Sequence, residues 1–201
     1  MSQQLNLLVI LGATAGGKTG LAVRAAKRFS AEIISADSRQ VYRGMDLGTG
    51  KDLQEYGDVP YHLIDIAEPG SEYNVFQFQH DCFAAIEDVW SRGKLPLLCG
   101  GTVMYLDAVL RGYRLVEVPE DPQLRSEMEL LADDLLRDRL LQLKPEQHNR
   151  TDLDDRQRLI RAIEIALGEQ EAAEELPPLP EIRPLVFGLQ WPREILRQRI
   201  A

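Results

Sequence analysis

A glycine-rich segment near the N-terminus has the residue types and the spacing of a phosphate-binding loop. Gly12 and Gly17 permit backbone turns that side chains would block, so the loop N–H groups can converge on phosphate oxygens. Lys18 adds a cation, and the Thr19 hydroxyl is placed to ligate Mg²⁺. A chance turn is the alternative, but a strand predicted at Leu7–Leu11 and a helix predicted after the loop supply the required context. The segment matches Gly-x-x-x-x-Gly-Lys-Ser/Thr and reads Gly12-Ala13-Thr14-Ala15-Gly16-Gly17-Lys18-Thr19.

Two further polar groups follow predicted strands. Asp37 comes after the apolar stretch Glu32–Ser35, and a carboxylate at the carboxyl end of a parallel strand faces the ligand crevice of the sheet. There Asp37 could ligate Mg²⁺ through water or accept a proton from a nucleophile, although its position fits a turn or cap equally well. Gly100-Gly101-Thr102 follows Leu95–Cys99 and offers N–H groups and a hydroxyl to an anion, although Gly-Gly is common in turns.

Other charged residues give weaker signals. Asp65 follows Leu63-Ile64 like a Walker B aspartate, but the residues before it match loosely and favour a structural role. Arg156, Arg158 and Arg161 crowd one predicted helix and could clamp phosphates, yet their acidic neighbours favour a solvated, salt-bridged face. The three histidines are scattered and no cysteine pair has ligand spacing, so a zinc site is not expected.

Alternating strand and helix patterns must position these groups. Apolar residues at helical spacing predict one helix after the loop and another from Val75 to Trp90, with Asn74 as its N-cap. Two further helices are predicted at Val103–Leu110 and from Pro192 onward. This alternation predicts an α/β fold that is P-loop NTPase-like, with a parallel sheet flanked by helices. The predicted strands are Leu7–Leu11, Glu32–Ser35, Tyr61–Ile66, Leu95–Cys99 and Leu185–Leu189.

The character of the chain changes after Pro119. Pro122–Leu143 is charged and leucine-rich and predicts one or two helices, and Asp154–Leu167 predicts another. The segment after this helix is rich in glutamate and proline, as exposed linkers are. We therefore expect a core at 1–118 and 185–201, a small helical insertion at 119–167, and an acidic linker at 168–184.

Composition excludes several classes of protein. The 201 residues are 44% hydrophobic, yet no apolar run is long enough to span a bilayer, and the first residues do not form a signal peptide. The two cysteines cannot form a disulfide framework. A cytoplasmic protein without membrane contact is expected. The net charge of −9 does not predict a dedicated nucleic-acid binder.

The block around Asp37 is the most specific part of the sequence, because ordinary P-loop kinases do not carry it. The block, together with other segments, resembles the tRNA dimethylallyltransferase family, also called tRNA isopentenyltransferases, over nearly the whole chain. The block reads Ile34-Ser35-Ala36-Asp37-Ser38-Arg39-Gln40-Val41-Tyr42-Arg43-Gly44-Met45-Asp46. The other segments are the P-loop, Gly48-Thr49, Tyr61–Asp65, Pro96–Leu98 with Gly100-Gly101-Thr102 and Tyr105, Arg158–Glu164, and Gly188–Arg193.

The resemblance implies a reaction. The P-loop would hold the diphosphate of dimethylallyl diphosphate, and the acceptor would be the N6 amine of the adenosine next to the anticodon. Asp37 would accept a proton from this amine. Lys18, Thr19 and Mg²⁺ would stabilise the departing diphosphate, and Thr102 would lie near the reacting centre.

The resemblance also implies contacts to the anticodon stem-loop of tRNA. The residues concerned are Asp37, Ser38, Arg39, Gln40, Thr102, Arg125, Gln157, Arg158, Leu159, Ile160 and Arg161. Arg125 aligns after a shift of one residue, and Asp65 moves towards a scaffold role. Ala13 stands where the family favours proline, Gly16 where it favours serine, and Asp154 where asparagine is common. Family members continue past the helix at Pro192 into a part with further tRNA contacts and an active-site arginine.

Three alternatives remain beside tRNA prenylation. The acceptor could be a free adenine nucleotide, as in related enzymes. The P-loop alone would permit an ATP-dependent kinase of a small metabolite. The chain could also be a non-catalytic, truncated homologue that binds a diphosphate. The expected partners are dimethylallyl diphosphate and tRNA, and the expected state is a monomer.

Overall fold

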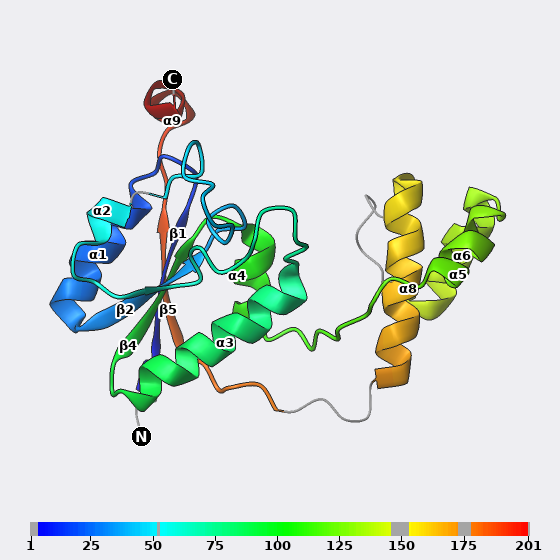
Figure 1. The fold of residues 1–201 in the computed structure, drawn as a ribbon, viewed down its shortest axis with the longest axis horizontal. Coiled ribbons are helices and arrows are strands. Elements are labelled where there is room, and N and C mark those ends of the chain that lie inside the picture. The colour runs from blue at the N-terminus through cyan, green and yellow to red at the C-terminus, as the bar shows by residue number, and fades with distance from the viewer. Residues whose placement is uncertain (1–3, 52, 146–152, 173–177, 201) are drawn as a thin grey trace. The chain divides into compact units, whose positions relative to one another are not determined.

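The computed structural model of the chain describes residues 4–51, 53–145, 153–172 and 178–200. Within these residues, five parallel strands form one sheet in the order β3-β2-β4-β1-β5. Helices alternate with the strands, which confirms the predicted α/β fold (Figure 1). The strands are β1 (Leu7–Gly12), β2 (Ala31–Ala36), β3 (Tyr61–His62), β4 (Leu95–Gly100) and β5 (Pro184–Leu189).

Helices cover both faces of the three central strands, so these strands carry apolar residues on both faces. Successive residues of a strand point to opposite faces, so Val9 and Ile10 of β1 enter different cores. Val9 packs with residues of α3 (Val75–Ser91) and α4 (Val103–Leu110), among them Phe78, Ile86 and Val109. Ile10 packs with residues of α1 (Lys18–Phe29), among them Ala22, Val23 and Ala26. The predicted continuous apolar strands are thus confirmed as the centre of a three-layer arrangement (Figure 1).

Helix α3 begins at the predicted cap. The Asn74 side chain accepts a 3.1 Å hydrogen bond from the Gln77 N–H, and the Gln77 side chain accepts one of 2.9 Å from the Asn74 N–H. This reciprocal pair satisfies two N–H groups that the first turn leaves without helical partners. The capping box therefore fixes the start of the helix that covers one face of the sheet.

The third strand is shorter than predicted. The sequence predicts a strand at Tyr61–Ile66, but β3 contains only Tyr61 and His62. Leu63 and Asp65 adopt left-handed backbone conformations, with φ of 61° and 57°, which a strand cannot accommodate. The apolar pattern arises because Leu63 and Ile64 are buried in a turn.

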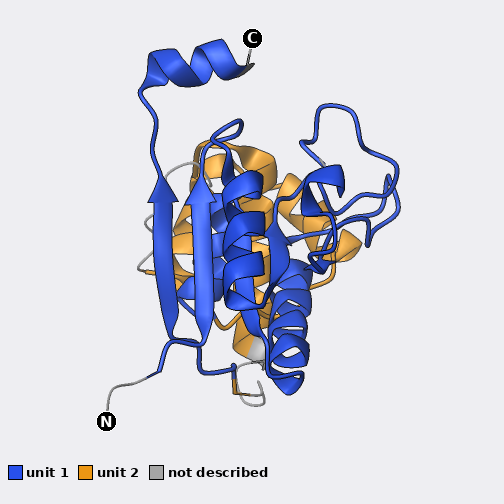
Figure 2. Cartoon of the chain, turned by 90° about the vertical axis from the view of Figure 1, so that its left-hand side faces the viewer, with its two compact units in different colours: residues 1–113, 179–201 blue, residues 114–178 orange. Residues whose placement is uncertain are grey.

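The chain divides into two compact units, 1–113 with 179–201 and 114–178, coloured blue and orange in Figure 2. The first unit contains the sheet, and also α2 (Leu53–Tyr56) and α9 (Arg193–Ile200). The second contains α5 (Pro122–Glu129), α6 (Asp133–Leu143) and α8 (Arg156–Ala172) around an apolar core. The sequence placed these boundaries after 118 and before 185.

The predicted acidic linker at 168–184 is partly wrong. Helix α8 continues through Gly168 to Ala172, and Pro184 is the first residue of β5. Gly168 lies inside the helix and allows close packing: a Cβ there would lie 2.6 Å from Cγ2 of Val118. Glu169 then forms a 2.7 Å ion pair with Lys144. Residues 173–177 of the predicted linker lie outside the described residues.

Candidate active site

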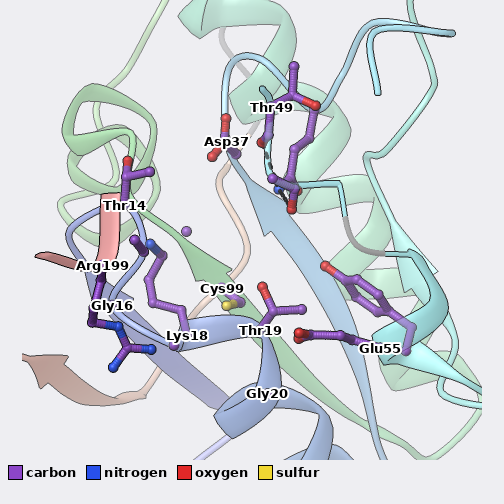
Figure 3. A pocket seen from close by; sticks show the side chains of 16 residues that line it. Thr14, Gly16, Lys18, Thr19, Gly20, Asp37, Thr49, Glu55, Cys99 and Arg199 are labelled. Atoms are coloured by element: carbon purple, nitrogen blue, oxygen red, sulfur yellow. Dashed lines mark hydrogen bonds between the residues drawn. The ribbon is translucent and has the colours of Figure 1, made fainter. Parts of the chain in front are cut away.

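The P-loop joins β1 to α1 and lines a cavity of about 290 Å³ (Figure 3). Gly17 precedes α1 with a φ of 80°, a conformation that favours glycine. No side chain caps the first N–H groups of α1, so these donors are left for an anion at the helix N-terminus. The structure therefore has the backbone arrangement that phosphate binding needs, and residues Thr14–Thr19 line the cavity.

Lys18 folds back over the loop. Its ammonium donates a 2.8 Å hydrogen bond to the Ala13 carbonyl. It also approaches the Gly-Gly-Thr segment, since a Cβ on Gly101 would lie 3.6 Å from Nζ. This position puts the cation between two loops that follow neighbouring strands, β1 and β4. A phosphate entering the cavity can replace the Ala13 carbonyl as the acceptor for Lys18.

Asp37 lies across the same cavity from Lys18 and Thr19 (Figure 3). It follows β2, and its Oδ1 accepts a 3.0 Å hydrogen bond from the Arg39 N–H. Among the described residues, no hydrogen bond reaches Oδ2. The turn therefore holds the carboxylate in place by one oxygen, and the second oxygen is available for a substrate proton.

Thr102 supports the Asp37 loop and does not line the cavity. Its Oγ1 accepts a 3.0 Å hydrogen bond from the Ser38 N–H, and its own N–H donates one of 3.2 Å to the Ala36 carbonyl. Gly100 permits this approach, since a Cβ there would lie 2.1 Å from the Ala36 oxygen. In this structure the Thr102 hydroxyl therefore holds the Asp37 loop, and its contact with an anion stays a prediction.

Gln40 connects β2 to the far wall of the cavity. Its buried side chain accepts a 2.8 Å hydrogen bond from the Ser35 hydroxyl and donates one of 3.0 Å to the Gly50 carbonyl. Gly50 and its neighbour Thr49 line the cavity. Gln40 thus lines the cavity and fixes this wall, whereas Arg39 is exposed beside it.

The buried ammonium of Lys51 holds the two ends of the segment from Tyr42 to Lys51 together. The Lys51 ammonium donates 2.5 Å to the Tyr42 carbonyl and 3.2 Å to Asp46, and it forms an ion pair with Asp65. Burial alone would lower the Lys51 pKa, but the hydrogen bonds to Asp65 and Asp46 outweigh it and raise the pKa. The Asp65 carboxylate is therefore part of the scaffold, as the structural reading of the sequence favoured.

The cavity also contains residues that the sequence analysis did not single out. Glu55, Tyr56, Cys99 and Arg199 line it. Burial raises the Cys99 pKa to about 12, so this thiol is neutral at physiological pH. Arg199 lies on the last helix, where Arg193 and Arg197 also occur; this group of basic residues is the signal that could have drawn attention to it.

The donor atoms at the cavity fit Mg²⁺. The Thr19 hydroxyl and the carboxylates of Asp37 and Glu55 line the same space, and Mg²⁺ prefers oxygen ligands. Among the described residues, no group of three or more His, Cys, Asp or Glu side chains is arranged for a metal. This donor set suits an ion held by one or two protein oxygens together with phosphate oxygens.

The predicted tRNA contacts of the second unit have unequal exposure. Gln157 and Arg158 are exposed on α8, whereas Leu159 and Ile160 are 1% and 3% exposed in the core of the unit. Contact of the segment Gln157–Arg161 with tRNA stays a prediction, whereas the Leu159 and Ile160 side chains pack in this core. They lie on the inner side of an amphipathic helix, and they hold its outer side in place.

Glu164 organises two arginines in the same unit. Arg125 donates to its carboxylate through Nε at 3.1 Å and Nη2 at 2.9 Å. Arg161 forms an ion pair with Glu164 and donates 2.8 Å to the Val118 carbonyl. Burial would raise the Glu164 pKa, but the hydrogen bonds from Arg125, the Asp121 N–H and Arg161 lower it. Arg125 and Arg161 are thus fixed by a buried carboxylate and remain partly exposed.

Comparison with known proteins agrees with this geometry. A family model described as IPP transferase matches residues 40–201, which is most of the chain. The chain belongs to the IPP transferase family. A second family model, described as isopentenyl transferase, matches residues 5–56, which contain the P-loop and Asp37.

Members of the IPP transferase family with high similarity to this chain come from several bacteria. The chain is 64% identical over 196 residues to tRNA dimethylallyltransferase 2 of Syntrophotalea carbinolica, covering 98% of this chain and 66% of that protein. It is 60% identical over 196 residues to tRNA dimethylallyltransferase 1 of Geotalea daltonii, covering 98% and 63%. The chain thus spans just under two thirds of the length of these relatives.

Solved structures of the family share the fold. The tRNA isopentenylpyrophosphate transferase of Bacillus halodurans is 36% identical, with a TM-score of 0.64, covering 98% of this chain and 64% of that one. A eukaryotic dimethylallyltransferase acting on tRNA is 28% identical, with a TM-score of 0.78, covering 98% and 51%.

The departure from the family pattern at Gly16 has a structural counterpart. The Gly16 carbonyl accepts a 3.0 Å hydrogen bond from the indole N–H of Trp191. A Cβ on Gly16 would lie 2.8 Å from the Ala13 oxygen, so the loop in its present conformation has no room for serine. The P-loop backbone in this conformation therefore requires glycine at position 16.

Proposed function

We propose that this chain transfers a dimethylallyl group from dimethylallyl diphosphate to the N6 amine of the adenosine next to the anticodon in tRNA. The observation that carries the proposal is that Asp37 and the P-loop line one cavity. A diphosphate cradle and a candidate base therefore face the same space. The names of the similar IPP transferases support the same activity.

The chain's own residues account for each step of this substitution. The P-loop N–H groups and Lys18 bind the diphosphate and orient the allylic carbon towards Asp37. The N6 nitrogen forms a bond to that carbon while the bond from carbon to the diphosphate oxygen breaks. Asp37 accepts the proton that the amine loses, and the diphosphate leaves with the bonding electron pair. Thr19 would help to hold Mg²⁺, which would supply positive charge to offset the charge on the leaving group.

Recognition of tRNA is assigned to exposed polar groups. Arg39 lies in the loop beside Asp37, and Gln157 and Arg158 lie on the outer side of α8. Guanidinium groups suit phosphate because they can donate two parallel hydrogen bonds. Arg39 and Arg158 provide local positive charge on a chain whose net charge is −9. Contact with the anticodon stem-loop is therefore proposed for these sites.

The proposal includes a monomer in the cytoplasm. The two cysteines are free and buried, as in proteins of reducing compartments. In the described part of the chain, no helix combines the length and the apolar character of a membrane span. Size-exclusion chromatography with light scattering tests the monomeric state.

The activity is tested by incubating the protein with Mg²⁺, labelled dimethylallyl diphosphate and unmodified tRNA. We expect label in the tRNA, located by nuclease digestion and mass spectrometry on the N6 atom of the adenosine next to the anticodon. A tRNA with guanosine at that position is the matched control and should stay unlabelled.

Other outcomes would replace the proposal. Transfer to AMP or ATP in place of tRNA would indicate a free-nucleotide prenyltransferase. Phosphoryl transfer from ATP without affinity for the allylic diphosphate would indicate a kinase. Thermal protection by dimethylallyl diphosphate without any transfer would indicate a binding protein.

A further inference from the structure

The segment after β5 is attached directly to the P-loop. Trp191 donates its 3.0 Å hydrogen bond to the carbonyl of Gly16, which is buried. A Cβ on Gly16 would lie 3.8 Å from Cδ1 of Trp191, so the indole packs against the loop backbone. Helix α9 begins two residues later, at Arg193. The start of α9 is therefore fixed relative to the phosphate-binding loop.

The side chain of Arg199 extends from α9 towards the P-loop. It lines the cavity, and its Nη2 lies 3.6 Å from the position that a Cβ on Gly17 would occupy. Its Cζ lies 5.1 Å from the centroid of the Trp191 ring, within the range of a cation–π interaction. Figure 3 shows the guanidinium beside Gly16 and Lys18. Trp191 thus contacts both the loop and the arginine.

Arg199 differs from other arginines of the chain in its surroundings. Other arginines of the chain, such as Arg92 and Arg156, form ion pairs with acidic side chains. Among the described residues, no Asp or Glu forms an ion pair with Arg199. A guanidinium that stacks on an aromatic ring keeps its N–H donors free at the edge. Here this edge borders a cavity built for an anion.

We propose that Arg199 is a further ligand of the diphosphate, acting together with Lys18 on the leaving group. Trp191 is a positioning residue that holds the guanidinium at the loop. For the reaction, this inference rests on the proposed function; for diphosphate binding, it rests on the cavity alone. A planar guanidinium can donate to two phosphate oxygens at once, which a second lysine could not.

Calorimetric titration with inorganic pyrophosphate and Mg²⁺ tests the binding role. We expect Arg199→Ala to weaken binding about 10- to 100-fold, because a charge-assisted hydrogen bond is lost. Arg199→Lys should recover part of the affinity, since it restores the charge without the planar fork. Arg197→Ala is the matched control: it removes the same charge from α9 at an exposed residue outside the cavity lining. It should change the affinity by less than about twofold.

The result that overturns the proposal is equal pyrophosphate affinity in Arg199→Ala and Arg197→Ala. Circular dichroism of both variants checks that α9 and the sheet are retained. A role in packing alone would also leave Arg199→Lys no tighter than Arg199→Ala, whereas a phosphate ligand makes the lysine variant intermediate.

The prenylation assay separates this inference from the proposed function. If the wild-type chain labels tRNA and Arg199→Ala matches it in both binding and rate, the inference fails while the function stands. If the wild-type chain labels no acceptor but Arg199→Ala still weakens pyrophosphate binding, the function fails while Arg199 remains an anion ligand. With both correct, Arg199→Ala lowers kcat/KM for dimethylallyl diphosphate, and Arg197→Ala does not.

Discussion

The backbone N–H of Ser38 donates a 3.0 Å hydrogen bond to Oγ1 of Thr102, which joins the loop after β2 to the loop after β4. These strands are neighbours in the sheet, with Ala36 opposite Gly100, so both loops leave the sheet at the same edge. The bond fixes the backbone next to Asp37 without entering the cavity. Thr102 therefore acts on the proposed reaction through the position of Asp37.

Replacing Thr102 should affect the rate more than binding. We expect Thr102→Ala to lower kcat about 10- to 100-fold, since a small displacement of a catalytic group has effects of this size. The affinity for pyrophosphate should change little, because Thr102 does not line the cavity. Steady-state prenylation kinetics and calorimetry measure the two effects. Thr102→Ser, which keeps the hydroxyl, should remain close to wild type; equal losses in both variants would contradict a role for the hydroxyl.

Replacing Asp37 should separate chemistry from binding. Asp37→Asn keeps the size of the side chain but removes the base, so we expect kcat to fall about 10²- to 10⁴-fold. Lys18→Ala removes a cation from the loop and should weaken pyrophosphate binding as well. Single-turnover rates and calorimetry distinguish the two variants. If both lose pyrophosphate binding equally, Asp37 is a ligand and not the base.

The ion pairs of Glu32 should make the free energy of unfolding depend on pH. Glu32 is buried, accepts a 2.7 Å hydrogen bond from Arg92, and lies 2.8 Å from Nε2 of His62. The Arg92 hydrogen bond lowers the Glu32 pKa below its ordinary value of 4.5, against the opposing effect of burial. The pKa of Glu32 is therefore lower in the folded chain than in the unfolded chain. The ionised carboxylate stabilises the fold at pH values above the unfolded-state pKa, and this stabilisation is lost as the pH falls through the folded-state pKa.

Urea unfolding followed by circular dichroism at several pH values measures this effect. Glu32→Gln should be less stable than wild type at pH 7 and should lose less stability between about pH 5 and pH 3. Glu87→Gln, at an exposed residue of α3, is the matched control and should follow the wild-type curve. Parallel curves for Glu32→Gln and wild type would show that Glu32 does not contribute to the pH dependence.

Gly100 should tolerate no side chain. A Cβ would lie 2.1 Å from the Ala36 carbonyl oxygen, so Gly100→Ala requires two central strands to move apart. We expect a loss of about 3 kcal/mol and a Tm lower by about 6–12 °C. At Gly188 on β5, the nearest atom to an added Cβ is 3.6 Å away, an ordinary contact. Gly188→Ala should therefore stay near the wild-type Tm, and a similar drop in both variants would contradict the steric argument.

The sequence correctly predicts the buried central strands. It fails where a buried apolar segment does not have the backbone conformation of a strand. The strand at Leu95–Cys99 is a continuous apolar run and was found almost as predicted. At Leu63-Ile64 the same apolar signal marks a turn, because hydrophobicity reports burial and does not report φ. The helix predicted to end at Leu167 continues through Gly168, where the lack of a side chain allows close packing against Val118.

In the site, the sequence identifies residues that belong to a short local motif. It does not identify residues that the fold brings in from a distant part of the chain. The P-loop and Asp37 each lie within one short motif, so the sequence alone identified them. Arg199 was missed because only the pairing of β1 with β5 brings its helix to the loop. The resemblance places Leu159 and Ile160 in a segment that contacts tRNA, and the structure adds that their side chains lie on the core side of the helix.

The pairing of β5 with β1 has a consequence during synthesis on the ribosome. β1 comes from residues 7–12 and β5 from residues 184–189, so the strand that covers one edge of β1 is translated after the other four described strands. At rates of 5–20 residues per second, the β1 edge and the apolar residues of α1 wait roughly 10–35 s for β5. The nascent protein therefore exposes an open sheet edge for that interval, and general chaperones should bind it most strongly then.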